Sequence, residues 1–237
     1  MKIFVDSANI DDIEEAIQRG FVTGITTNPS ILSKEGQVNF HDHIRKIINI
    51  AERYGCDIPL SVEVFSTSHD EMIEQAENFV EQFGFYGNIT VKIPIGWNEL
   101  AVIRELRKRD IKVNCTCCMS FNQAIMAANA GANYVSLFYG RIRDIGYDAA
   151  SVVRQVHLTL REWDHPCEII VGSIRHIADI NEAMQAGANI VTVPPKFFRQ
   201  MVSHPKTDEA VQQFVSDSRD WLGDPRLNGV MAVPSAR

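Results

Sequence analysis

The chain has 237 residues, 45% of them hydrophobic, and a formal net charge of −7. A chain of this length can bury one large core, and a single α/β barrel is a common architecture at this size. The acidic balance argues against a general nucleic-acid binder, whose contact surface is basic. No window approaches the roughly 18 consecutive apolar residues of a membrane span, and the first residues lack the apolar core of a secretory signal. We therefore expect a cytoplasmic protein with no membrane partner.

The cysteines favour a reducing compartment. The five of them stand at positions 56, 115, 117, 118 and 167. An odd number with three bunched together does not suit a disulfide framework. Cys115 and Cys118 match C-x-x-C, but residues three apart on a strand point to opposite faces, and no second pair completes a zinc site. We expect structural thiols rather than a metal or redox centre.

Short apolar runs alternate with longer amphipathic segments along the chain. The runs predict strands at 2–6, 24–28, 60–64, 89–93, 112–116, 134–138, 168–173 and 189–193. The segments predict helices at 10–19, 39–54, 69–83, 98–109, 120–130, 148–163, 177–186 and 207–222. Ser68 and Glu71 have the spacing of a capping box before the third helix. We expect one domain over 1–222 and a tail over 223–237.

Eight strand–helix units in alternation predict a parallel sheet. Eight units at this length predict closure into a (β/α)8 TIM barrel with an extra C-terminal helix. An open doubly wound sheet is the alternative, but the usual G-x-G-x-x-G after its first strand is absent. The stretch Ala130–Val135 recurs two units later as Ala186–Val191. Duplication and convergence on a favourable helix-to-strand turn both explain this repeat.

In such a barrel the chemistry belongs at the C-terminal strand ends. Seven predicted strands place inward-pointing polar groups near that end: Asp6, Thr26 with Asn28, Ser61 with Glu63, Thr90 with Lys92, Asn114 with Thr116, Ser136, and Ser173. Each alone has an ordinary explanation as a backbone partner, a helix cap or half of an ion pair. Burying all of them in one cavity mouth is costly unless they serve a function.

Lys92 lies in the apolar run Ile89–Ile93, where its charged form is disfavoured. A neutral amine can attack a ketone to form a Schiff base, which accepts electrons when the neighbouring C–C bond breaks. The departing alcohol and the departing water each need an acid/base, and Asp6 and Glu63 can supply both. This set predicts a class I aldolase-type cycle, and a structural Lys92–Glu63 ion pair is the alternative.

Two arginines occupy matching positions beyond the sixth and seventh strands. Arg141 follows Phe-Tyr-Gly, and Arg175 follows Gly-Ser-Ile. Barrel enzymes frequently hold phosphate in the loops after their last strands, and the arginine fork suits phosphate oxygens. The alternative is a pair of solvated surface side chains.

Six stretches together carry a family resemblance: FVDSAN at 4–9, GITTNPSIL at 24–32, VKIP at 91–94, GANYVSLFYGRI at 131–142, GSIR at 172–175 and ANIVTVPP at 188–195. On these residues the chain resembles transaldolases, and especially the small transaldolase and fructose-6-phosphate aldolase branch. The resemblance covers the chain from Lys2 to about residue 220. It implies a (β/α)8 barrel that acts on a sugar phosphate without a metal or an organic cofactor.

The resemblance also implies roles for individual residues. Lys92 falls on the Schiff-base lysine, and Asp6 on the acid/base for C–C cleavage and formation. Glu63 and Thr116 fall on the pair that positions the water of imine formation and hydrolysis. Further implied contacts are Asn28 and Asn114 with substrate hydroxyls, Ser136 with the substrate, and Arg141, Ser173 and Arg175 with the phosphate. We add Thr26 and Phe138 to the expected substrate-binding residues.

Two positions separate the activities of this branch. The aldolases resemble each other in having Gln where Glu63 stands and Tyr where Phe138 stands. We therefore expect a transaldolase of the pentose phosphate pathway, which transfers dihydroxyacetone from a ketose phosphate of the fructose 6-phosphate or sedoheptulose 7-phosphate type to an aldose phosphate. An aldolase that releases this unit, an enzyme for an anionic ketose such as a sulfonate, and a non-catalytic sugar-phosphate-binding barrel are the alternatives.

A metal-dependent barrel enzyme is a further alternative. It would rest on His41 and His43, the one close histidine pair, but residues two apart do not face each other on a helix. The family resemblance implies instead a ring-like homo-oligomer, a pentamer or decamer, in which a C-terminal helix such as 207–222 crosses onto a neighbour.

The chain departs from the family pattern in two places. After the lysine it reads Pro-Ile-Gly-Trp-Asn-Glu-Leu over 94–100, where the family usually has Thr and Gly-Leu. Trp97 there either reshapes the donor or acceptor site or packs locally. The second place is the cysteine cluster, in which Cys118 shares a strand face with Thr116, and we expect Cys118 to approach the site.

Overall fold

The computed structural model of the protein describes residues 1–55 and 57–222. Cys56 and the expected tail at 223–237 lie outside the described residues. The chain divides into two compact units, Met1–Phe198 and the segment from Arg199 onward. The single domain expected over 1–222 stays a prediction.

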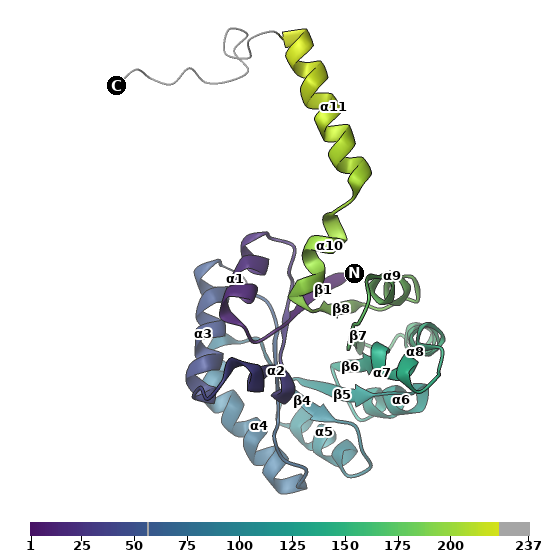
Figure 1. The fold of residues 1–237 in the computed structure, drawn as a ribbon. Coiled ribbons are helices and arrows are strands. Elements are labelled where there is room, and N and C mark those ends of the chain that lie inside the picture. Colours follow the sequence, from purple (N-terminus) through teal and green to yellow (C-terminus); the bar gives the residue numbers. More distant parts are fainter. Residues whose placement is uncertain (56, 223–237) are drawn as a thin grey trace. The chain divides into compact units, whose positions relative to one another are not determined.

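In the first unit, eight parallel strands close into a barrel with helices around it, which confirms the predicted (β/α)8 fold (Figure 1). Each strand pairs with the next, and β8 pairs with β1. The strands are β1 (Lys2–Asp6), β2 (Ile25–Thr26), β3 (Leu60–Glu63), β4 (Ile89–Pro94), β5 (Val113–Cys118), β6 (Tyr134–Phe138), β7 (Glu168–Gly172) and β8 (Ile190–Val193). Each predicted strand is found, most with ends shifted by one or two residues.

The helices follow the strands in alternation. They are α1 (Ile10–Gln18), α2 (Pro29–Leu32), α3 (Phe40–Arg53), α4 (His69–Phe83), α5 (Glu99–Lys108), α6 (Phe121–Asn129), α7 (Tyr139–Asp144), α8 (Ala149–Glu162), α9 (Ile177–Gln185), α10 (Phe198–Val202) and α11 (Pro205–Leu222), with short 3₁₀ turns at Ser33–Glu35, Gly84–Tyr86 and Pro195–Phe197. The eight predicted helices are present, including the extra C-terminal helix α11. The short helices α2, α7 and α10 follow β2, β6 and β8 and were not predicted.

Inside the barrel, an apolar layer lies directly below the layer of polar side chains. Phe4, Ile170 and Ile190 form a buried cluster with Tyr134 packed against it. Residues two positions further along the same strands point to the same side, and these are Asp6, Gly172, Thr192 and Ser136. The strand alternation therefore places polar groups directly above an apolar floor.

Gly24 makes room for this floor. A Cβ atom at Gly24 would lie 2.4 Å from ring atoms of Phe4. Phe4 is itself almost completely buried, so its ring has little space to move aside. A side chain at position 24 would therefore disturb the layer that supports Asp6.

The repeated Ala-Gly-Ala-Asn motif makes the same turn twice. Gly131 and Gly187 have φ values of 103° and 100°, which a residue with a side chain rarely adopts. Two residues later, Asn133 Oδ1 accepts from the backbone N–H of Val113 at 2.9 Å, and Asn189 Oδ1 accepts from that of Ile169 at 2.8 Å. Each asparagine thus fastens the start of its strand to the preceding strand.

Two local predictions were wrong. The second strand ends at Thr26 rather than residue 28, because Asn28 is the N-cap of α2 and its side chain accepts from the backbone N–H of Ile31 at 3.0 Å. The capping box before α4 does not form, since Ser68 makes no side-chain cap hydrogen bond. The Glu71 carboxylate accepts instead from the Ser66 hydroxyl.

A bulge in β5 changes which cysteine faces the barrel interior. The pairing of β5 with β6 shifts register between Cys115 and Cys118. Cys117 within this bulge has a φ of 62°, in the left-handed region. The extra residue reverses the alternation of side chains beyond this point.

In the second unit, α11 has an apolar stripe. Val211, Phe214, Val215 and Trp221 are all exposed within the described residues. The first three are spaced at i, i+3 and i+4, and Trp221 follows Phe214 by seven, so they share one helix face. Across the described helices, none is both long enough and apolar enough to cross a lipid bilayer.

Candidate active site

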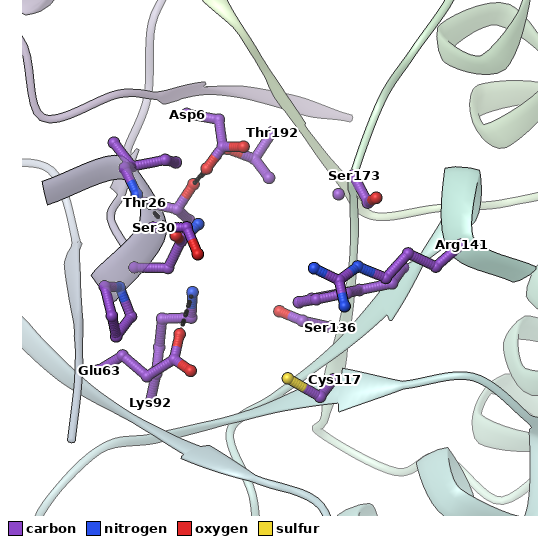
Figure 2. A pocket seen from close by; sticks show the side chains of 15 residues that line it. Asp6, Thr26, Ser30, Glu63, Lys92, Cys117, Ser136, Arg141, Ser173 and Thr192 are labelled. Carbon is purple, nitrogen blue, oxygen red and sulfur yellow. Dashed lines mark hydrogen bonds and ion pairs between the residues drawn. The ribbon is translucent and has the colours of Figure 1, made fainter. Parts of the chain in front are cut away.

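A cavity of about 340 Å³ opens at the C-terminal ends of the barrel strands (Figure 2). We call it the central cavity. The site residues expected from the sequence that line it are Asp6, Thr26, Asn28, Glu63, Lys92, Ser136, Phe138, Arg141 and Ser173. The fold therefore brings together side chains from six strands and the segments that follow them.

The buried Lys92 and the partly buried Glu63 form an ion pair at one wall of the cavity. They are register partners on β4 and β3, and Lys92 Nζ lies 3.0 Å from Glu63 Oε2. Lys92 Nζ also donates to the backbone carbonyl of Thr27 at 2.7 Å. Lys92 is only 4% exposed. The expected apolar surroundings are correct for the strand neighbours Val91 and Ile93 but wrong for the amine itself, which ends among oxygen atoms.

Asp6 belongs to a second polar group that lines the same cavity, together with Thr26 and Thr192. Thr26 Oγ1 donates to Asp6 Oδ1 at 2.8 Å and lies 2.5 Å from Thr192 Oγ1. Burial raises the pKa of the Asp6 carboxyl above its usual range, while the nearby charge of Lys92 and the hydrogen bond from Thr26 act in the opposite direction. Asp6 is thus poised to hold or release a proton closer to neutral pH than an exposed aspartate.

Thr192 lines the cavity but was missed by the sequence reading. It is the one polar residue of β8 and lies between the apolar Val191 and Val193. This alternation is the same signal that identified the inward-pointing residues of other strands. Applied to the eighth strand, it would have found Thr192.

A hydrogen-bonded chain lies under the cavity wall formed by β6. Ser136 Oγ donates to Asn114 Oδ1 at 2.7 Å, and Asn114 Nδ2 lies 3.4 Å from Ser61 Oγ. Asn114 and Thr116 are completely buried and do not line the cavity themselves. Thr116 Oγ1 has no hydrogen-bond partner within residues 1–55 and 57–222.

The two expected anion-binding arginines are not brought together. Arg141 lines the central cavity, with its guanidinium carbon 5.5 Å from the centre of the Phe138 ring, and points into the open space in Figure 2. Arg175 does not line this cavity. Its guanidinium pairs with Asp144 at 2.6 Å, because α7 ends at Asp144 beside the loop after β7.

The loop that carries Ser173 and Arg175 is held by backbone contacts. Ser173 has a φ of 58°, and its carbonyl accepts from the Gly140 N–H at 3.0 Å. The buried carboxylate of Asp179 accepts from the N–H groups of Arg175 and His176, both at 2.9 Å. These contacts fix the loop after β7 against α7 and α9.

Cys117, rather than Cys118, reaches the central cavity (Figure 2). The expectation for Cys118 was wrong because the β5 bulge exchanges the two positions. Cys118 is fully buried, with its Sγ 3.8 Å from the carbonyl oxygen of Cys115. The Cys118 thiol and burial both raise the pKa of Cys115, so these two side chains share a face, contrary to the expectation from regular alternation.

The start of α2 supplies further lining residues that the sequence reading did not single out. Pro29, Ser30 and Ile31 all face the cavity. They belong to the GITTNPSIL stretch at 24–32, in which proline directly after the capping Asn28 is a common start of a helix. This signal in the sequence would have been enough to predict the short helix α2 directly after β2.

Trp97 and the histidine pair lie elsewhere. Trp97 is 84% exposed before α5 and does not line the central cavity. His43 Nε2 lies 2.7 Å from the Ala8 carbonyl oxygen, whereas the His41 ring packs near Phe40 and Phe83. Within the described residues, no group of three or more His, Cys, Asp or Glu side chains is placed to hold a metal ion.

Comparisons with known proteins agree with the family resemblance noted in the sequence. A family model described as Transaldolase/Fructose-6-phosphate aldolase matches residues 3–224. A "Probable transaldolase 1" of Listeria monocytogenes is 41% identical over 217 residues, covering 92% of this chain and 97% of that one. A "Probable transaldolase" of Heliobacterium modesticaldum is 42% identical over 217 residues, with the same coverage of 92% and 97%.

Two further matches are another sequence relative and a solved structure. A "Probable transaldolase" of Caldicellulosiruptor saccharolyticus is 39% identical over 229 residues, covering 96% of this chain and all of that one. The solved structure of a flavocytochrome b2 variant with sulfite bound has a TM-score of 0.60 at 15% identity, and the match covers 83% of this chain and 57% of that chain. At that identity the structural likeness shows the barrel fold alone.

Proposed function

Because the chain belongs to the transaldolase/fructose-6-phosphate aldolase family, we propose that it transfers a dihydroxyacetone unit from a ketose phosphate to an aldose phosphate through a Schiff base on Lys92. The observation that carries this proposal is one buried amine in a cavity with two carboxylates, Glu63 beside it and Asp6 in the lining of the same cavity. Placing three ionisable groups in a barrel interior is costly, and a Schiff-base cycle uses each of them.

Imine formation begins at Lys92. Glu63 Oε2, 3.0 Å from Nζ, takes a proton from the ammonium group, and the free amine attacks the C2 carbonyl of the ketose to give a carbinolamine. Return of a proton to the carbinolamine hydroxyl lets water leave as the C–N double bond forms.

Cleavage of the C3–C4 bond depends on Asp6. Its carboxylate takes the proton of the C4 hydroxyl, the C3–C4 electron pair moves into the protonated imine to give an enamine, and the aldose phosphate leaves. A second aldose phosphate reverses these steps, and water then hydrolyses the new imine. The raised pKa of Asp6 suits a group that takes and returns one proton in each cycle.

We assign the water of imine formation and hydrolysis to Glu63 and Thr116. The buried Thr116 hydroxyl has no hydrogen-bond partner within the described residues, and a polar group left in this way is commonly satisfied by a buried water molecule. Substrate hydroxyls are assigned to Thr26, Asn28 and Ser136, with Asn114 fixing Ser136 through the 2.7 Å hydrogen bond. Phe138 holds Arg141 in place, and Arg141, Ser173 and Arg175 are assigned to the phosphate.

Borohydride trapping tests the proposal. Incubation with fructose 6-phosphate and sodium borohydride should reduce the imine and leave a stable adduct on Lys92, located by peptide mass analysis. Lys92→Ala is the control and should leave no adduct. An adduct on a different lysine, or none in the wild-type protein, would overturn the Schiff-base proposal.

A second measurement separates transfer from release. In the absence of an acceptor, a transaldolase retains the dihydroxyacetone unit on the enzyme, whereas an aldolase releases it. Accumulation of free dihydroxyacetone would identify the protein as an aldolase. A screen of donors and acceptors, with mass detection of the trapped adduct, would then identify the substrates.

We also propose that the protein is a homo-oligomer in which α11 contacts another copy. The exposed stripe of Val211, Phe214, Val215 and Trp221 supports this assignment, because burying such a face stabilises an assembly. Light scattering should show a pentamer or decamer for the wild-type protein and smaller species for Phe214→Glu. An unchanged mass for the variant would contradict this role of α11.

A further inference from the structure

A second cavity, of about 370 Å³, lies beside the central cavity. We call it the side cavity. The loops after β7 and β8 form it, and Ser173, Arg175, His176, Pro194 and Lys196 line it. Asp6 and Ser173 line both cavities, so these two residues lie between the two spaces. A substrate held at Lys92 would reach the side cavity if it extended past these two residues.

Lys196 is a cation whose charge is not compensated by a carboxylate. No ion pair of Lys196 occurs in the part of the chain that the structure describes, and its Nζ lies 4.9 Å from the centre of the Phe197 ring. By contrast, the guanidinium of Arg175 in the same cavity is 2.6 Å from Asp144. Of the lysine and arginine side chains that line the side cavity, Lys196 is therefore the one without an ion pair in the described residues.

Lys196 and Arg141 have matching arrangements on either side of Ser173. Arg141 follows β6, lines the central cavity and lies over the Phe138 ring. Lys196 follows β8, lines the side cavity and lies over the Phe197 ring. Three successive loops, after β6, β7 and β8, thus each bring one cation to the barrel opening, which is where barrels hold phosphate.

We propose that Lys196 is a specificity-determining residue that binds the terminal anion of the substrate together with Arg141, Ser173 and Arg175. We further propose that it selects a dianionic phosphate monoester over a monoanionic sulfonate. The proposal rests on the function proposed above. A phosphate monoester carries about −1.5 to −2 charges at pH 7, whereas a sulfonate carries one. Because Coulomb attraction is proportional to charge, an added cation favours the phosphate.

Lys196→Gln tests this role by removing the charge and keeping most of the side chain. Lys46→Gln, an exposed lysine on α3 outside both cavities, is the matched control. With fructose 6-phosphate as donor, Lys196→Gln should raise KM about tenfold and leave kcat within about twofold. With 6-deoxy-6-sulfofructose, KM should rise by less than about threefold. Lys46→Gln should change neither.

Two results would overturn the proposal. An unchanged KM for fructose 6-phosphate would show that Lys196 does not contact the anion. An equal loss for the phosphate and the sulfonate would show that Lys196 does not select between them. Trapped adducts on Lys92 in Lys196→Gln would show that the reacting end of the substrate is still bound correctly.

Binding of small anions keeps this test separate from the proposed reaction. Calorimetry with methyl phosphate and methanesulfonate needs no catalysis. Lys196→Gln should weaken methyl phosphate binding about tenfold and methanesulfonate binding by much less. Absence of an adduct on Lys92 in the wild-type protein would show that the proposed function is wrong. Separately, an equal effect of Lys196→Gln on both anions in calorimetry would show that the Lys196 proposal is wrong.

Discussion

Lys92 Nζ and Glu63 Oε2 lie 3.0 Å apart on residues that are register partners of adjacent parallel strands. Register partners point to the same side of a sheet, so closure of the barrel itself places the amine beside the carboxylate. No long loop or mobile side chain is needed to bring the two charges together. The pair is therefore part of the barrel as well as part of the candidate site.

Removing one member of this pair should destabilise the protein. Lys92→Met leaves the partly buried Glu63 carboxylate without its partner, and breaking a buried pair typically costs about 3–5 kcal/mol. The double variant Lys92→Met, Glu63→Gln should recover much of this loss because no buried charge remains unpaired. Urea unfolding of the two variants checks this, and equal stabilities would contradict it.

Glu63→Gln should increase release of dihydroxyacetone relative to transfer. The carboxylate stabilises the protonated imine through its charge, and the neutral amide does so less well. Overall turnover should fall, because the amide is no base for the water assigned to Glu63, but the ratio of release to transfer should rise about tenfold. Assays for dihydroxyacetone without an acceptor and for transfer with one measure this, and Ser66→Ala, outside the cavity, serves as control. A lower ratio of release to transfer than in the wild-type protein would count against this role of Glu63.

Asp6→Asn should stabilise the protein near neutral pH. Burial raises the pKa of Asp6, so the folded chain binds this proton more tightly than the unfolded chain. The contribution of Asp6 to stability therefore falls as pH rises from the usual carboxyl value of 3.8 through the raised pKa. Thermal unfolding should show an advantage of Asp6→Asn that grows from pH 4 to pH 7.

The control for this measurement is Asp70→Asn. Asp70 is 98% exposed beside His69, so its replacement removes a charge without removing a buried carboxyl. A stability difference for Asp6→Asn that is independent of pH would contradict the predicted linkage.

Alkylation should distinguish Cys117 from the other described cysteines. Cys117 lines the central cavity, whereas Cys115, Cys118 and Cys167 are buried. Iodoacetamide should modify Cys117 first, and fructose 6-phosphate should slow the reaction. Because burial raises the pKa of the Cys117 thiol, the rate should increase with pH. Peptide mass analysis locates the label, and faster labelling of Cys118 would contradict the bulge geometry.

Gly140→Ala should weaken substrate binding. A Cβ atom there would lie 2.3 Å from the Ser173 carbonyl oxygen, so the loops after β6 and β7 would have to move apart. Displacing Ser173 and Arg175 should raise KM for fructose 6-phosphate about tenfold. In Gly84→Ala the nearest atom would be at an ordinary 3.6 Å, and KM should not change. Equal KM values for the two variants would contradict this prediction.

Side-chain alternation predicted the parts of the fold that are regular. The bounds of β1 and β6 agree with the predicted strands, and the polar faces of β3 and β4 bring Glu63 and Lys92 together as expected. These predictions succeed because a strand buried on both sides has a strict period of two. The family resemblance was confirmed by the family model and by the curated relatives.

The parts that failed depend on contacts between distant segments. Nothing in the cysteine cluster reveals a bulge, which arises from the pairing of β5 with β6. The Arg175–Asp144 ion pair joins the segments that follow β6 and β7. Such a contact cannot be predicted from the positions of Arg141 and Arg175 in the sequence, so we did not foresee that only Arg141 lines the central cavity. The roles assigned to individual site residues stay predictions.

The bulge in β5 also affects how the substrate range of this barrel can be altered. Because the left-handed residue at position 117 reverses the alternation, a library that randomised Cys118 as an inward position would change packing against the helices. Variation at Cys117 would instead change the space in which the sugar lies. Deleting one residue of the bulge would restore regular alternation and turn the side chain that now packs against the helices toward the cavity. The bulge therefore determines which of the two positions affects substrate selectivity and which affects folding.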